Sequence, residues 1–229
     1  MYGNTSGVYN TAIGLNSLHD NTTGEANVAT GTEALQHNTT GDNNTASGRF
    51  AGEINTIGNN NTFIGAYTNA NFNSLSNVTA IGYGAVVNTS NDMRFGNDLV
   101  NWIGGAVPWT STSDKRKKKD IKDITHGLDF IKALHPVEYR MIKKDDNRLN
   151  FGFIAQDIEA LLGTKYNVLG VGGDKDRTLS LRYTDFIAPM VKAMQEQQGI
   201  IEQQKKSIAE MRSELDAMKA EIVAMKASK

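Results

Sequence analysis

Over the first hundred residues, apolar and polar side chains alternate in short stretches such as Thr11-Ala12-Ile13. A period of two indicates β-strands, because successive side chains of a strand point to opposite faces. The alternation returns every 17 residues, and each copy closes on one glycine of the series Gly14, Gly31, Gly48, Gly65 and Gly82. A second series with the same spacing comprises Gly7, Gly24, Gly41 and Gly58. Two turn markers in phase predict one rung copied about five times.

A rung of 17 residues is too short for a helical hairpin and suits two short strands with two turns. Glycine and asparagine would supply the corners, where a positive φ is needed. The expected core consists of small apolar residues, namely Ala12, Ile13, Leu18, Ala29, Leu35, Ala46, Ile64, Ala80 and Ile81. Because a single rung buries little surface, we expect stability from stacked rungs and from lateral association of several chains. Residues 1–100 are therefore predicted to form a parallel β-solenoid, either a β-roll or a triple β-helix.

Beyond residue 113 the pattern is that of a small α+β unit. Apolar residues at steps of four, three and three predict a helix from Ile124 to Leu134, which Pro136 ends. A second helix is predicted over Gln156–Leu162. Strands are predicted over Val137–Met141, Asn150–Ala155, Tyr166–Val171 and Thr178–Leu181, with a polar turn over Lys143–Arg148. These elements define an α+β domain over residues 113–183.

From Thr184 onward the pattern is helical and continuous. Steps of three and four run unbroken through Ile187, Met190, Met194, Gln197, Ile201, Gln204, Ile208, Met211, Leu215, Met218, Ile222 and Met225. This seam predicts a coiled coil over residues 184–229. Isoleucine at both a and d positions favours more than two strands, and Gln197 and Gln204 would fix the register at some cost in stability. The alternative is a single amphipathic helix that folds back on its own domain.

Charge is distributed unevenly along the chain. Residues 1–100 hold two bases, Arg49 and Arg94, and seven acids, which leaves 22 bases and 18 acids for the rest. Such a break indicates a domain boundary, and we place a linker over residues 101–112. The chain has no cysteine, which excludes disulfides and thiolate metal sites, and no apolar run long enough to predict membrane insertion. It begins within a repeat, so we expect it to be the C-terminal piece of a longer protein.

Five consecutive bases, Lys115–Lys119, follow the linker. Such a run is usually a solvated segment of the surface. A contact with nucleic acid has little support, because the run is short and lacks interleaved aromatic residues. The whole chain also has a net charge of −1, so we expect no nucleic-acid partner.

A third interpretation depends on the residues around the basic run. The stretch from Ser113 to Ile121 resembles the start of the endosialidase-type intramolecular chaperone. In that family the stretch reads Ser-Asp-x-Arg-Leu-Lys-x-Asp-Ile. This chain differs from the family pattern at Lys117, where the family has leucine. Further motifs of that family follow in order over Leu134–Tyr139, Phe151–Gln156 and Leu181–Tyr183. The family lies at the C-terminus of phage tail spikes and fibres and of some other trimeric proteins, and it cuts itself off through a serine–lysine dyad.

The resemblance implies that Ser113 is the nucleophile and Lys118 its base, with cleavage between Thr112 and Ser113. A serine hydroxyl needs an adjacent base, and a lysine can act as one only when burial or neighbouring cations lower its pKa. Such cations could come from Lys115, Arg116, Lys117 and Lys119. The implied activity is a serine endopeptidase that acts once on its own chain and does not turn over external substrates. The alternative, suggested by Lys117 in place of leucine, is a chaperone fold that does not cut.

Other chemistry has little support in the sequence. His19 and His37 occupy equivalent repeat positions and are expected in turns or at the surface, whereas His126 and His135 flank a predicted helix and are expected to cap or pack. The acidic pair Asp145-Asp146 lies in a polar turn and is expected to be solvated. Without a phosphate loop, a metal-ligand spacing or a dinucleotide motif, we expect no cofactor and no metal.

The repeats themselves resemble the head repeats of trimeric adhesins and the shafts of phage fibres. Together the resemblances imply the distal part of a homotrimeric phage-type tail fibre, made in the host cytoplasm and located in a virion or an extracellular injection particle. A host-surface receptor or glycan is then a candidate partner. The main alternative is a non-catalytic trimeric adhesin stalk with a permanent coiled coil. A glycan depolymerase would need catalytic carboxylates upstream of these repeats.

Overall fold

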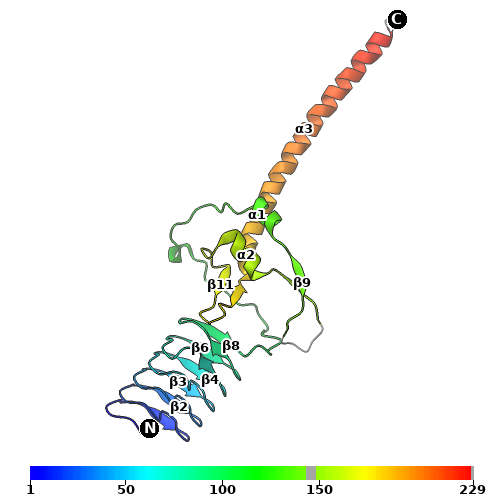
Figure 1. Ribbon diagram of the computed structural model, residues 1–229. Coiled ribbons are helices and arrows are strands. Elements are labelled where there is room, and N and C mark those ends of the chain that lie inside the picture. Colours follow the sequence, from blue (N-terminus) through cyan, green and yellow to red (C-terminus); the bar gives the residue numbers. More distant parts are fainter. Residues whose placement is uncertain (143–147, 228–229) are drawn as a thin grey trace. The chain divides into compact units, whose positions relative to one another are not determined.

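The computed structural model describes residues 1–142 and 148–227. The chain divides into two compact units, whose elements are drawn in Figure 1. Unit 1 consists of residues 1–111, 139–150 and 171–179, and unit 2 of residues 112–138, 151–170 and 180–229. The predicted polar turn over Lys143–Arg148 lies outside the described residues except for Arg148, and so does the acidic pair Asp145-Asp146.

Unit 1 is a parallel β-solenoid of about five turns, seen in Figure 1 as a stack of rungs. Its main sheet contains, in order, β1 (Thr11–Ile13), β2 (Val28–Thr30), β3 (Thr45–Ser47), β4 (Thr62–Ile64), β6 (Thr79–Ile81) and β8 (Met93–Phe95). From β1 to β6, each residue pairs with the residue 17 positions later, as Thr11 does with Val28. The last step is shorter, because Thr79 pairs with Met93. The 17-residue repeat of the sequence is therefore the rung of the solenoid.

A second strand in every rung was expected, and this prediction is wrong for the first rungs. The second pair that forms joins β5 (Asn69–Ala70) to β7 (Val86–Val87). At the positions equivalent to Asn69, Leu18 and Leu35 have φ values of 47° and 48°. A left-handed residue interrupts an extended strand, so these segments are turns. Their backbone still bonds to the next rung, as Leu18 N does to Ala34 O at 3.0 Å.

In the main sheet from β1 to β6, the middle residue of each strand is more buried than its two neighbours and faces the solenoid interior. Of the core residues predicted, those that are fully buried are Leu18, Ala29, Leu35, Ala46 and Ala80. Three predicted core isoleucines lie instead on the outer face of the sheet, namely Ile13, Ile64 and Ile81. Ile13 is 60% exposed, so its assignment to the core is wrong. The cause is the period of two, since an inward alanine forces both of its neighbours outward.

Two columns of asparagine run through the solenoid interior. In the first, Asn38 donates from Nδ2 to Asn21 Oδ1 at 2.9 Å, and Asn55 donates in the same way to Asn38 at 2.8 Å. In the second, Oδ1 of Asn27 accepts from the backbone N of Asn44 at 2.9 Å. These side chains are fully buried, and buried polar groups are tolerated only when they are paired. The asparagines are thus structural partners between rungs, a role beyond the corners that the sequence predicted.

Unit 2 is built from short elements around the start of a long helix. They are η1 (Lys115–Lys117), α1 (Leu128–Ala133), β9 (Val137–Tyr139), β10 (Asn150–Gly152), α2 (Ala155–Leu162), β11 (Leu169–Val171), β12 (Leu179–Leu181), η2 (Tyr183–Phe186) and α3 (Ile187–Ala227). β9 pairs with β10, and β11 pairs with β12. The predicted elements are present, although α1 is shorter than the helix expected from Ile124 to Leu134.

The core of unit 2 is small and aromatic. Ile158, Val168 and Phe186 are buried, and Phe130, Phe153 and other half-buried side chains pack against them. Glu196 of α3 accepts a hydrogen bond of 2.7 Å from the backbone N of Leu128, at the first residue of α1. A carboxylate at a helix N-terminus satisfies a backbone donor that has no partner within the helix. This contact joins α1 to α3.

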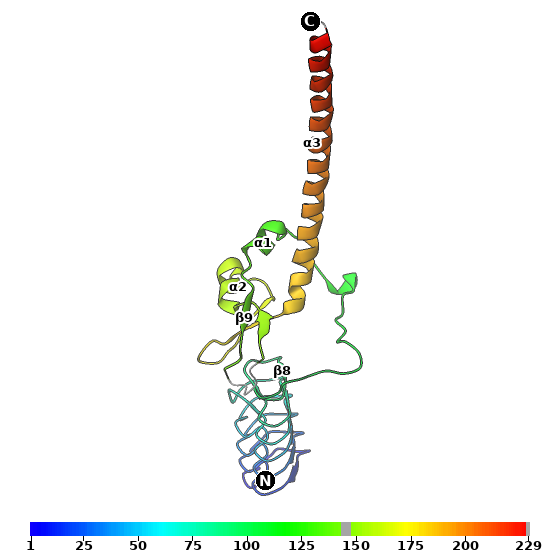
Figure 2. The same cartoon turned by 90° about the vertical axis from the view of Figure 1, so that its right-hand side faces the viewer.

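The long helix α3 leaves this core and runs on alone, as Figure 2 shows. Every residue from Gln197 to Lys226 is exposed. The predicted seam is therefore uncovered, with Met211, Leu215 and Met218 being 58%, 47% and 53% exposed. The alternative of an amphipathic helix folded back on its own domain is wrong for this half, because its residues stay exposed. No helix among the described residues has the length and apolar character needed to cross a membrane.

Candidate active site

The segment from Ser113 to Lys118 is shaped by one short helical turn. Asp114 precedes η1 and caps it, because its Oδ1 accepts from the backbone N of Arg116 at 2.8 Å. The turn closes with Lys117 N bonded to Asp114 O at 3.0 Å and Lys118 N bonded to Lys115 O at 3.1 Å. Aspartate is a preferred capping residue, because its short side chain reaches the backbone two residues on. The turn thus brings both of its ends close together.

This turn places the two predicted site residues in contact. Lys118 donates from Nζ to Ser113 Oγ across 2.7 Å, although five positions separate them in the chain. A hydroxyl and an amine at this distance are within reach for proton transfer. The scissile bond expected from the sequence, Thr112–Ser113, directly precedes the serine. The two predicted site residues and the predicted scissile bond therefore lie in one segment of unit 2.

Both side chains of this pair are exposed, as is Thr112. A lysine acts as a general base only in its neutral form, which burial and nearby cations favour. Neighbouring cations are present in Lys115, Arg116, Lys117 and Lys119. Burial is not supplied within the described residues of this single chain, so any covering of the pair has to come from elsewhere.

Two further charges of the turn, those of Asp114 and Arg116, pair with each other. The guanidinium of Arg116 donates from Nε and Nη2 to Asp114 Oδ2 at 3.1 and 2.7 Å. The pKa of the Asp114 carboxyl is lowered, chiefly by the hydrogen bond from the Arg116 side chain and then by that from its backbone. The pKa of Arg116 is raised by the same contact. Asp114 therefore keeps its charge, and with it the cap, to a lower pH than an unpaired aspartate would.

The sequence did not indicate that Asp114 would pair with Arg116. From the sequence, Arg116 was one of several cations expected near Ser113 and Lys118. An aspartate followed two residues later by a base is a spacing that permits both an Asx-type turn and a short-range ion pair. That spacing was the available signal.

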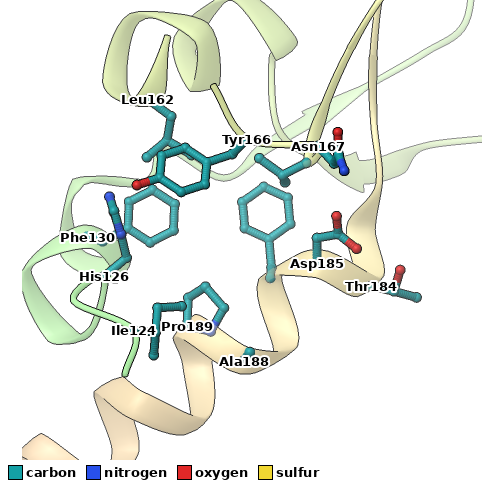
Figure 3. A pocket seen from close by; sticks show the side chains of 12 residues that line it. Ile124, His126, Phe130, Leu162, Tyr166, Asn167, Thr184, Asp185, Ala188 and Pro189 are labelled. Carbon is teal, nitrogen blue, oxygen red and sulfur yellow. The ribbon is translucent and has the colours of Figure 1, made fainter. Parts of the chain in front are cut away.

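Unit 2 also contains an open apolar cavity of about 410 Å³, shown in Figure 3. Its walls include Phe130, Leu162 and Phe186, and the ring of His126 meets that of Tyr166 edge to face at 5.1 Å. The volume would hold a small ligand. Neither Ser113 nor Lys118 lines this cavity, so it is separate from the candidate active site, and His126 packs against aromatic rings as expected.

The other histidines do not form a catalytic arrangement. His19 and His37 both face Asp20, with Nδ1 atoms 2.6 and 2.7 Å from its two oxygens. His135 lies 3.9 Å from Asp157. No group of three or more His, Cys, Asp or Glu side chains among residues 1–142 and 148–227 is arranged to hold a metal ion.

Comparison with protein families identifies the segment that holds the site. Residues 113–165 match the family model described as chaperone of endosialidase. The match begins at Ser113 and ends before Leu181–Tyr183, the last of the motifs that suggested the resemblance. No curated protein and no solved structure matched the chain. The match confirms the resemblance seen in the sequence: residues 113–165, which contain Ser113 and Lys118, are similar to the chaperone of endosialidase.

Proposed function

We propose that this chain is the distal part of a trimeric phage-type tail fibre, with a C-terminal intramolecular chaperone that releases itself by cutting between Thr112 and Ser113. The observation that carries the proposal is the 2.7 Å contact between Lys118 Nζ and Ser113 Oγ. It lies in a segment similar to the chaperone of endosialidase. The place of action would be a virion tail fibre or an extracellular injection particle, after synthesis in the host cytoplasm.

The proposed cut is a transfer of one acyl group followed by hydrolysis. Ser113 Oγ bonds to the carbonyl carbon of Thr112 while neutral Lys118 takes the hydroxyl proton. The bond between that carbon and the backbone N of Ser113 then breaks, and the proton passes from Lys118 to the leaving amine. Water cleaves the resulting ester, which regenerates the Ser113 hydroxyl and leaves a carboxylate on Thr112. The reaction occurs once per chain, because the chain contains a single target bond and hydrolysis consumes it.

The homotrimer in this proposal is supported first by α3. Its exposed seam carries isoleucine at both a and d positions, a choice that favours more than two strands. Met194 is 68% exposed and Met225 61% exposed, which is costly for apolar side chains in water. Burial against two further copies would remove this cost, so we assign the seam to self-association.

A second support is the outer face of the main solenoid sheet. Its outward residues are uncharged and often apolar, including Ile13, Val28 and Ile64, which are 39–60% exposed. The charged residues of the first four rungs, such as Asp20, Glu33 and Asp42, lie outside the sheet strands. A flat uncharged face repeated at every rung suits contact with the same face of another copy. We therefore propose that this face also packs between chains.

Trimerisation by the coiled coil and its later removal by self-cleavage would complement each other. Repetitive sheets can slip in register, and their exposed edges promote aggregation while chains are unfolded. A coiled coil at the C-terminus would align three chains before the rungs form. Removing the coiled coil afterwards would leave a shaft that stays folded because it unfolds very slowly. A receptor or glycan on a host surface remains the proposed target of the shaft.

The second candidate is a permanent adhesin-like stalk without catalysis. The observation that favours it is the exposure of Ser113 and Lys118 in the single chain, together with Lys117 where the family has leucine. In that case the coiled coil would stay attached and the dyad would be inactive.

The deciding experiment compares the purified chain with Ser113→Ala and Lys118→Ala variants on a denaturing gel with intact-mass measurement. We expect fragments of about 112 and 117 residues from the parent chain and none from either variant. Lys119→Ala is the matched control, since it removes a neighbouring charge and should still cut. One uncut band from all four proteins would reject cleavage and favour the permanent stalk.

A further inference from the structure

We propose that Arg116 is a positioning residue of the Ser113–Lys118 dyad, because it holds the carboxylate of Asp114 away from the amine of Lys118. The inference rests on the proposed function, since positioning matters only if the dyad cuts. It adds a role for a side chain that touches neither the nucleophile nor the base.

The turn contains a group that could disable the base. Asp114 directly follows Ser113 and is four residues from Lys118. An amine paired with a carboxylate holds its proton more tightly, and a protonated amine cannot accept the proton of the serine. An ion pair between Asp114 and Lys118 would therefore oppose cleavage.

The observed geometry avoids this pair. The Asp114 oxygens accept from Arg116 through its Nε at 3.2 and 3.1 Å, its Nη2 at 2.7 Å and its backbone N at 2.8 Å. In the part of the chain that the structure describes, all hydrogen-bond partners given for this carboxylate thus come from Arg116. Lys118 is left to donate to Ser113 at 2.7 Å.

Arginine suits this role better than the lysines around it. The basic run contains four lysines and Arg116. A guanidinium is a planar fork that matches both oxygens of a carboxylate, whereas an ammonium is a point charge on a flexible stem. A lysine at position 116 would hold Asp114 through fewer hydrogen bonds and release it more often.

The charged residues next to Lys118 along the chain lie in its own segment. Over the described residues, the hydrogen bonds and ion pairs of residues 113–118 stay within that stretch. The groups to consider are therefore Lys115, Lys117, Lys119 and Asp120, besides the Asp114–Arg116 pair. Asp120 has a left-handed φ of 55° and follows the turn. It is present unchanged in every variant of the test below.

The test is the rate of self-cleavage against pH for the full chain and its variants. Arg116→Ala frees Asp114 and removes one positive charge, whereas Lys119→Ala removes one charge and leaves the Asp114–Arg116 pair intact. We expect the midpoint of the rate profile for Arg116→Ala to lie about half a pH unit above that for Lys119→Ala, the size typical of an exposed pair. Arg116→Lys should fall between Arg116→Ala and the parent chain.

A double variant distinguishes the effect of the freed carboxylate on the rate profile from the effect of the lost cation. Asp114→Ala with Arg116→Ala leaves no carboxylate at position 114, so its midpoint should return toward that of the parent. Its rate should nevertheless fall, because the turn loses its cap. A purely structural role for Arg116 would lower rates without moving the midpoint.

A second measurement does not require cleavage. In the uncut Ser113→Ala chain, Lys118 should become reactive toward acetic anhydride at a higher pH when Arg116→Ala is added, as read by peptide mass. If the parent chain cuts but Arg116→Ala matches Lys119→Ala in both measurements, the inference is wrong and the proposed function stands. If the parent chain cuts at no pH, the proposed function is rejected, and this inference with it.

Discussion

The side-chain amide of Asn38 donates to Oδ1 of Asn21 one rung earlier, across 2.9 Å in the interior of the solenoid. The same Nδ2 donates to Gly41 O at 2.9 Å, and Oδ1 accepts from Asn55 at 2.8 Å. One buried side chain therefore joins three rungs. Because water cannot reach these groups, each of them depends on its neighbour in the column.

Asn38→Ala should consequently destabilise unit 1 strongly. The change leaves a buried acceptor on Asn21 and a buried donor on Asn55, and each unpaired group costs about 1–3 kcal/mol. We expect a loss of about 3 kcal/mol in the free energy of unfolding, measured by denaturant titration. The exposed Asn73→Ala is the control and should change little. Equal effects of both substitutions would contradict a role for the buried column.

Gly31→Ala tests how closely the rungs approach each other. Gly31 has a φ of 133°, and a Cβ built there would lie 2.5 Å from the carbonyl oxygen of Gly48. The clash is with backbone, which cannot rotate away, so we expect a loss of about 2–4 kcal/mol or failure to fold. Gly105→Ala is the matched control, because a Cβ at Gly105 meets nothing within 4 Å. Thermal melts of both variants by circular dichroism give the comparison, and an unchanged melting temperature for Gly31→Ala would show that the rungs can separate.

The rung length and its phase could be read from the sequence because glycine is required wherever backbones touch. Gly31 and Gly48 mark such contacts, so their spacing gave the 17-residue repeat. The orientation of the isoleucines was missed, since apolar character alone does not show which face of a strand a residue occupies. Ile13 follows the inward Ala12 and is therefore exposed. The interior asparagines had the same spacing as the glycines, and that periodicity was the signal for their burial.

The sequence suggested the residues of the candidate site but not their geometry. The motif around Ser113 pointed to Lys118 as its partner, but no pattern of residue types gives the distance between two side chains. That distance depends on the 3₁₀ turn of Lys115–Lys117 and on the Asp114 cap, which are local backbone choices. The long helix was predictable because its seam repeats many times. The strands of unit 2 were predicted at the right places, although each is shorter than expected.

Acid should weaken the contact between neighbouring rungs at Asp20. Its pKa is lowered by the hydrogen bond with His19, and next by that with His37. A carboxyl whose folded pKa is lowered adds stability above its unfolded pKa, and this is lost as pH falls through the folded value. The difference in melting temperature between the parent chain and Asp20→Asn should therefore be full above about pH 4 and shrink below it.

The control for this prediction is Asp129→Asn in unit 2, whose carboxylate is fully exposed and lies 3.6 Å from a lysine. Asp129→Asn should change the melting temperature only slightly at every pH. A difference for Asp20→Asn that stays constant down to about pH 2.5 would mean that Asp20 acts through packing and not through its charge.

The exposed seam of α3 gives the most direct test of assembly, because its apolar side chains, such as Met211 and Leu215, are exposed in the single chain. Met211→Glu places a charge in the middle of the seam, where three copies would bury it together at a cost of several kcal/mol. In the uncut Ser113→Ala chain we expect light scattering to give three times the 25.0 kDa chain mass, and about one chain mass once Met211→Glu is added. Ser213→Glu adds the same charge on the opposite side of the helix and should leave the trimer intact. If the parent chain has the mass of one chain, or if the trimer survives Met211→Glu, the seam does not hold the chains together.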